Sequence, residues 1–231
     1  TPVLCCDTIT ELAQTLAVGT GGEALATNAE VAERSDLLVL CHKPLQLDEV
    51  AEQVGGRAKA VASILAGVSL AALEAAYPNT PVVRLMPNTA VEVARGVICY
   101  ARGRLVDDQL AAQVVELFER AGKTVMVEER LIDVAMGLMA VAPAYVALIA
   151  EAWTDAGVAH GMRAEQAAEL VVEAIAGSAE LLLAHDLDML RVRRAVTTPG
   201  GVTAQGLAAL ERGGLRPAFR DALDAVIARV G

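Results

Sequence analysis

Seven residues near the C-terminal end, from Thr197 to Thr203, read Thr-Thr-Pro-Gly-Gly-Val-Thr and have the composition of an anion-binding turn. Pro199 cannot continue a preceding helix, and Gly200-Gly201 allow the backbone to approach a ligand closely. A helix beginning at Val202 would present free N–H groups and the positive end of its dipole at this point. These properties predict a carboxylate-binding site. The alternative interpretation is an ordinary helix start after a Pro-Gly turn.

A second group of residues follows short apolar runs that are typical of buried strands. Asp7, Lys43-Pro44, Ala66-Gly67 and the stretch from Met86 to Thr89 each come directly after such a run. Ligands of open α/β sheets bind beyond the carboxyl ends of the strands, so this pattern predicts a nucleotide-binding edge. For Lys43-Pro44 the alternative is a strand end followed by a solvated lysine.

The elements that must position these residues change in character along the chain. The first half alternates strands and helices, with strands expected at residues 3–6, 37–41, 60–65, 81–85, 97–101 and 124–127. This rhythm predicts parallel βαβ units in a doubly wound α/β sheet. Beyond residue 128 only helical periodicity remains, with helices expected at residues 129–139, 143–160, 164–185, 188–196, 202–213 and 217–229. The expected domains are therefore residues 1–127 and 128–231.

Composition and charge exclude several classes of function. The formal net charge of -10 is unsuited to phosphate backbones, so nucleic acid is not expected as a partner. The four cysteines form no CxxC pair, and no histidine lies at metal-ligand spacing from them. We therefore expect buried, reduced thiols, no metal site and a cytoplasmic protein. His42, His160 and His185 are scattered, and none is expected to act as a catalytic acid.

One uncharged segment, from Val134 to Ala150, resembles a membrane span in composition. Asp133 and Glu151 bound it, Pro143 interrupts it and basic flanks are absent, which favours a buried helix. A helix that is apolar on all sides needs partners on every side. A homodimer would supply them, and no membrane association is expected.

Seven strings, taken together and in order, resemble the pyrroline-5-carboxylate reductase family over residues 1 to about 229. They are Lys43-Pro44, Ile64 to Val68, Val83 to Thr89, Pro143-Ala144-Tyr145, Asp155 to Val158, Thr197 to Thr203 and Leu210 to Arg216. The resemblance implies an N-terminal Rossmann domain for NADP or NAD and an all-helical C-terminal domain. It also implies a homodimer or larger homo-oligomer that reduces 1-pyrroline-5-carboxylate, a cyclic imine carboxylate, to L-proline in proline biosynthesis.

The resemblance also assigns roles to individual residues. It implies that Thr198, Gly200, Gly201 and Val202 bind the substrate carboxylate, and that the hydroxyl of Thr203 faces the ring nitrogen as the catalytic group. The residues expected to bind the cofactor are Asp7, Asn28, Lys43, Pro44 and Ala66, with Met86, Pro87 and Asn88 on the nicotinamide side. An acid at the position of Asp7 favours NADH over NADPH, although an aspartate that caps the following helix is the alternative.

The sequence departs from the family pattern in two places. The family opens with a strand and a GxGxxG-type loop, whereas this sequence begins at the second strand, and Gly19, Gly21 and Gly22 follow a helix. We expect a piece of a longer chain; the alternative is a natural relative without dinucleotide binding, retained for dimerisation alone. The stretch from Met139 to Ala142 replaces a Ser-Gly-Ser-Gly run, which favours reduction of a different cyclic imine as a further alternative.

Overall fold

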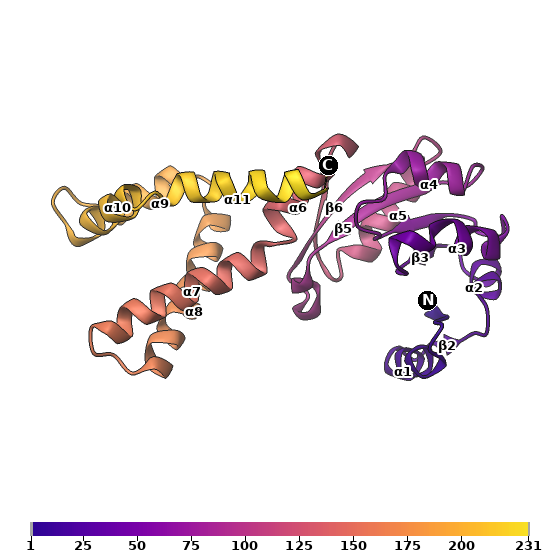
Figure 1. Cartoon of the computed structure of the whole chain (residues 1–231), viewed down its shortest axis with the longest axis horizontal. Helices are drawn as coiled ribbons and strands as arrows, with labels where there is room; N and C mark the ends of the chain where they lie inside the picture. Colours follow the sequence, from indigo (N-terminus) through magenta and orange to yellow (C-terminus); the bar gives the residue numbers. More distant parts are fainter. Residues whose placement is uncertain (1, 231) are drawn as a thin grey trace. The chain divides into compact units, whose positions relative to one another are not determined.

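The computed structural model describes residues 2–230 and divides them into two compact units, residues 2–140 and 141–229. Each unit is described by itself (Figure 1). The division falls thirteen residues beyond the predicted boundary at residue 127, because the helix that follows Leu131 packs with the first unit. The functional boundary after residue 127 remains a prediction.

The first unit contains two sheets and the helices between their strands. Strands β1 (Leu4–Cys5) and β2 (Glu23–Ala24) form a two-stranded parallel sheet. The second sheet has the order β3-β4-β5-β6-β7. Its strands are β3 (Leu38–Leu40), β4 (Val61–Ser63), β5 (Val82–Pro87), β6 (Gly96–Arg102) and β7 (Gly122–Met126). The expected α/β class is confirmed, and β1 and β3 lie in different sheets.

One expectation about the sheet is wrong. Strands β3, β4 and β5 are parallel, as are β6 and β7, but β5 and β6 are antiparallel. Only a short 3₁₀ segment, η2 (Thr89–Val93), connects β5 to β6. A parallel pair needs a crossover of a dozen or more residues, so this connection permits only an antiparallel return.

Alternate residues of the strands face two separate apolar cores. Val61, Val82 and Met86 belong to the larger core, together with residues of α2, α3, α4 and α6, whereas Ala62 and Val83 belong to the smaller core with residues of α5. The period-2 alternation of a sheet with two buried faces therefore continues through its middle strands.

The helices of this unit are α1 (Thr10–Thr20), α2 (Asn28–Arg34), α3 (Leu47–Val54), α4 (Leu70–Ala76), α5 (Asp108–Phe118) and α6 (Ile132–Met139), with 3₁₀ segments η1 (Pro44–Gln46) and η3 (Glu129–Leu131).

The second unit is entirely helical, as the sequence predicts. Its helices are α7 (Ala142–Ala159), α8 (Ala164–Ala184), α9 (Met189–Ala195), α10 (Val202–Arg212) and α11 (Leu215–Val230). Helices α7 and α8 lie side by side (Figure 1), and Gly157 of α7 allows close approach to Ala167 of α8. Tyr145 and Phe219 make an edge-to-face ring contact between α7 and α11.

The apolar stretch from Glu129 to Ala159 has the length and composition of a membrane span. The helix expected at 129–139 begins with the 3₁₀ segment η3, so α6 starts at Ile132, whereas α7 agrees with the helix expected at 143–160 to within one residue at each end. Ile132 and Met139 of α6 are buried in the larger core, whereas large apolar side chains of α7 such as Leu148 and Trp153 are exposed in the single chain. Within one chain, the segment from Val134 to Ala150 that was expected to be buried is therefore fully buried only at Gly137 and Met139 of α6.

Gly122 offers a test of the sheet because it lies opposite Gly96 at the start of β7, with φ of 154°. A Cβ at this position would collide with the backbone of Gly96. We expect Gly122→Ala to lower the free energy of unfolding by about 1–3 kcal/mol, as overpacking of a closed site does. Gly19→Ala, in a helix with open space around the added Cβ, is the matched control and should raise it by up to about 1 kcal/mol. Equal denaturation midpoints for Gly122→Ala and the unmodified protein would contradict this account of the strand pairing.

Candidate functional site

The turn before α10 has the geometry of an open anion site. Helix α10 begins at Val202, as predicted, with Gly201 as its extended N-cap residue and no capping side chain. Gly200 has φ of 72°, a conformation that favours glycine, and the N–H of Gly201 donates to the carbonyl of Thr198 at 3.0 Å. A Cβ on Gly201 would collide with Oγ1 of Thr198. The turn thus holds its shape through backbone contacts and leaves the first-turn N–H groups without a side-chain cap.

The residues of this turn differ in exposure. Thr198, Gly200 and Val202 are exposed, with Val202 at 88%, while Gly201 and Thr203 are half-buried. Thr197 is occupied elsewhere, because its hydroxyl donates to the carbonyl of Arg193 at 2.6 Å. The last turn of α9 carries Arg193 and Arg194. The positive end of the α10 dipole lies at this turn and suits a small carboxylate.

The structure brings three of the predicted cofactor segments to one edge of the five-stranded sheet. Lys43-Pro44, Ala66 and Asn88 follow β3, β4 and β5, which are adjacent and parallel. Lys43 and Ala66 are exposed, and Gly67 has φ of 75° with open space around it. The edge combines small residues, a free ammonium side chain and the carboxyl ends of strands, which is the usual location of a nucleotide in such sheets.

His42 introduces a buried polar atom at the same edge. Its Nδ1 lies 2.9 Å from the carbonyl oxygen of Lys43, while its buried Nε2 has no hydrogen-bond partner among the described residues. Buried polar groups are normally satisfied, so an unpartnered ring nitrogen marks a place for a polar ligand or water. The residues present at this edge therefore fit a dinucleotide, while Gly21 and Gly22 lie at the C-terminal end of α1 and not at a strand end.

Asp7 and Asn28 lie beside the two-stranded sheet, after β1 and at the start of α2. Oδ1 of Asp7 accepts a hydrogen bond from the N–H of Ile9 at 2.8 Å and one from the hydroxyl of Thr8 at 3.4 Å. The side-chain amide of Asn28 donates to Oε1 of Gln53 at 2.6 Å. Asp7 thus shapes the turn into α1 with one carboxylate oxygen, and its cofactor role remains a prediction, as does that of Asn28.

The nicotinamide-side residues are held more tightly than the sequence suggests. Met86 is buried in the larger core, and Pro87 and Asn88 are half-buried. The side chain of Asn88 uses both of its polar atoms: Oδ1 accepts from the N–H of Val97 at 3.1 Å, and Nδ2 donates to the carbonyl of Met139 at 3.0 Å. The structure therefore gives Asn88 a fixed place between β6 and α6.

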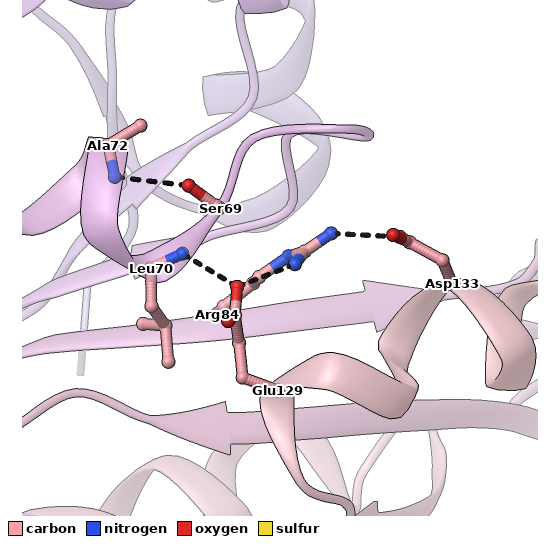
Figure 2. A network of polar contacts seen from close by, with 6 residues as sticks. All are labelled: Ser69, Leu70, Ala72, Arg84, Glu129 and Asp133. Atoms are coloured by element: carbon pink, nitrogen blue, oxygen red, sulfur yellow. Dashed lines mark hydrogen bonds and ion pairs between the residues drawn. The ribbon is translucent and has the colours of Figure 1, made fainter. Parts of the chain in front are cut away.

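Sequence reasoning missed a polar network on β5, which Figure 2 shows. Arg84 is 4% exposed, and its Nη1 and Nη2 contact Oε1 of Glu129 at 2.9 Å and Oδ1 of Asp133 at 3.3 Å. The same Glu129 oxygen accepts the N–H of Leu70 at 2.9 Å. A signal was available, because Arg84 interrupts the apolar run from Val82 to Met86 and buried arginines require carboxylate partners.

The cysteines supply no activated nucleophile near these residues. All four are free, but only Cys99 is buried, so the expectation of buried thiols is wrong for the exposed Cys41 and the half-buried Cys5 and Cys6. Desolvation of the thiol raises the pKa of Cys6 and Cys99, and also of Cys41 although that residue as a whole is exposed, and for Cys6 the neighbouring Asp7 adds to the increase in pKa. These three thiols stay protonated at neutral pH, because desolvation disfavours the thiolate.

The helical part of the chain matches a known protein family. Residues 129–231 match the family described as pyrroline-5-carboxylate reductase dimerisation. This match includes all of α7 to α11 and starts close to the predicted boundary at residue 127.

Known proteins are similar over most of the chain. The pyrroline-5-carboxylate reductase of Synechocystis sp. is 37% identical over 204 residues, which cover 87% of this chain and 76% of the relative. That of Mycobacterium tuberculosis is 34% identical, covering 94% and 81%. A solved pyrroline-5-carboxylate reductase from Coxiella burnetii superposes with a TM-score of 0.92 at 28% identity, covering 98% and 86%. The Plasmodium falciparum pyrroline carboxylate reductase with NADP bound gives 0.81 at 28% identity, covering 91% and 82%.

Proposed function

Because this chain belongs to the pyrroline-5-carboxylate reductase family, we propose that it reduces 1-pyrroline-5-carboxylate to L-proline with NAD(P)H, using the residues described above. The observation that carries this proposal is the uncapped start of α10 after the Thr198–Gly201 turn. Its N–H groups suit the carboxylate that distinguishes this substrate from a simple imine. We also place the reaction in the cytoplasm.

Substrate binding starts from the carboxylate. The N–H groups of Val202 and Thr203 are not used by a capping side chain, and Gly200 leaves room for a ligand oxygen beside the backbone. Thr198 adds an exposed hydroxyl. Fixing the carboxylate at a rigid helix end orients the attached ring, and orientation is the main requirement of a hydride transfer.

Thr203 is our candidate for the catalytic group. It lies one residue inside α10, so the same helix that holds the carboxylate also sets the position of its hydroxyl. A reduced imine needs a proton at nitrogen, and a threonine hydroxyl can donate a hydrogen bond there and accept one from water. NAD(P)H supplies the hydride when it is bound.

The cofactor edge is assigned to residues after adjacent strands. We assign Lys43, Pro44 and Ala66 to the dinucleotide phosphates and ribose, and Met86, Pro87 and Asn88 to the nicotinamide side. Lys43 provides an exposed positive charge for an anionic ligand. Asp7 and Asn28 complete the assignment on the adenosine side, where the free oxygen of Asp7 favours ribose hydroxyls.

The helical unit forms a homo-oligomer. It carries the dimerisation family match, and α7 exposes Leu148 and Trp153 while α8 exposes Leu170 and Val172 in the single chain. Apolar side chains of this size and number are covered in stable proteins, and a second copy of the chain provides the cover.

Reduction of a different cyclic imine is a second candidate. It is favoured by the apolar Met139-Ala140-Val141-Ala142 stretch, in which Met139 is buried and held through its carbonyl by Asn88. Side chains of this kind are more apolar and bulkier than serine and glycine, and would favour a less polar imine.

The proposed activity is tested with full-length protein, 1-pyrroline-5-carboxylate and either NADH or NADPH. We expect L-proline to form, measured by chromatography alongside the loss of absorbance of the reduced nicotinamide. A panel of five- and six-membered cyclic imines separates the two candidates by their kcat/KM values. No proline with either cofactor would exclude the first candidate, and a higher kcat/KM for another ring would favour the second.

Replacing Thr203 by valine removes the hydroxyl and preserves the shape. We expect kcat to fall by about ten- to a hundredfold with little change in KM, because proton transfer and not binding is impaired. Thr15→Val is the control, since the hydroxyl of Thr15 only contacts a carbonyl within α1. An unchanged kcat in Thr203→Val would remove Thr203 from the chemistry.

Replacing Asp7 by asparagine keeps an oxygen for the N–H of Ile9 and removes the charge. We expect the ratio of kcat/KM for NADPH to that for NADH to rise by about five- to tenfold, as a surface charge near a phosphate would give. Asp36→Asn, which affects only the exposed contact with Lys59, should leave this ratio unaltered. If the ratio also stays constant in Asp7→Asn, then Asp7 serves only the turn into α1.

A further inference from the structure

Helix α6 is attached to β5 at both of its ends. At its first turn, Nη2 of Arg84 contacts Oδ1 of Asp133, and Nη1 contacts Glu129 in the η3 segment just before the helix (Figure 2). At its last residue, the carbonyl of Met139 accepts the amide of Asn88. Ile132, which is fully buried, packs into the larger core near the first attachment. A helix of only eight residues is thus fixed at two points to one strand and its extension.

The chemistry of the Asn88 side chain makes its attachment directional. The N–H of Val97 can only donate and the carbonyl of Met139 can only accept, so one orientation of the amide satisfies both. No other natural side chain of this size presents a donor and an acceptor in this arrangement. Asn88 therefore joins β6, the end of β5 and the end of α6 through a single planar group.

The Arg84 attachment is strong for a different reason. The guanidinium is buried, so loss of either carboxylate leaves part of a charge without a partner in an apolar layer. Its Nε has no hydrogen-bond partner among the described residues, so only the two Nη contacts offset the cost of burying the charge. Glu129 also holds the first N–H of α4, which extends the attachment to a neighbouring helix.

We propose that Arg84 and Asn88 are positioning residues for the reduction, and that they set the distance between the nicotinamide side of the sheet edge and the end of α6. This inference rests on the proposed function. Met86, Pro87 and Asn88 end β5, while Met139 and Ala140 end α6, and the Asn88 amide joins the two segments directly. Asn88 lines the nicotinamide side, but both polar atoms of its amide are used within the protein, so the side chain acts on the position of α6.

A misplaced end of α6 should affect the chemical step more than cofactor binding. The cofactor edge is formed by β3, β4 and β5, whose pairing does not involve α6. Displacing a wall of the site by about 1 Å can cost up to about a hundredfold in rate. We therefore expect kcat to fall by about tenfold or more in Asn88→Asp and Arg84→Met, with the Kd for NADPH within about twofold.

The experiment combines hydrogen exchange with kinetics on the full-length protein. Asn88→Asp keeps the acceptor for Val97 and places an oxygen against the carbonyl of Met139. Amide exchange should then rise in the last turn of α6, where the N–H of Ala140 bonds to Met136. Arg84→Met should raise exchange in the first turn. Arg104→Met, which loses its contacts with Glu74 and the carbonyl of Pro78, is the matched control for both measurements.

Arg84→Lys keeps the charge and should recover part of the lost kcat, and it replaces Arg84→Met if that variant fails to fold. Faster exchange in α6 with lower kcat and an unchanged Kd for NADPH would support the proposal. Unchanged exchange in α6, or faster exchange with unchanged kcat, would overturn it. A Kd for NADPH that rises in step with the loss of kcat would also overturn it, because Asn88 would then be a cofactor ligand. Absence of proline formation by the unmodified protein would exclude the proposed function instead, and the exchange data would still decide whether the two side chains hold α6.

Discussion

A guanidinium in the larger core is the constraint on which the first unit depends. Arg84 occupies a position of β5 where the alternation places apolar residues, and it is only 4% exposed. Removing one partner from a fully buried ion pair costs about 3–5 kcal/mol. Glu129 and Asp133 are 37% and 41% exposed at their side chains, so water reduces the cost here. Because Arg84 needs these two carboxylates, the segment from Glu129 to Met139 packs against β5, the middle strand of the sheet.

The packing of this segment against β5 explains why the first compact unit extends to Ala140, beyond its last strand β7. Without Arg84, α6 would have only its apolar contacts through Ile132, Met139 and their neighbours. The antiparallel return of β6 contributes as well, because it brings Val97 beside Asn88 and leaves the amide of Asn88 free to reach Met139. The short connection η2, which makes β5 and β6 antiparallel, thus also allows Asn88 to form the second attachment of α6.

Local patterns in the sequence were sufficient to predict where most strands and helices lie, but not which distant side chains they contact. The apolar runs located the five strands of the larger sheet, and Pro199-Gly200-Gly201 located the start of α10, because these signals lie within a few residues. The contacts of Arg84 join residues 45 and 49 positions apart, and no periodicity reports such a distance. The bond from the amide of Asn88 to Met139, 51 residues away, could not be predicted for the same reason. The short strand β2 was not predicted either, because its two residues, Glu23 and Ala24, show no alternation of apolar and polar side chains.

The turn before α10 belongs to a helical unit whose apolar side chains are not all buried within one chain. Val171 of α8 is buried, yet Leu148, Trp153 and Leu170 are exposed, and α7 contains no fully buried residue in the single chain. A ligand that binds only the assembled form stabilises it, and assembly then raises the affinity for that ligand by the same factor. If the carboxylate that we propose at this turn binds only the oligomer, its apparent affinity will depend on protein concentration wherever the oligomer dissociates.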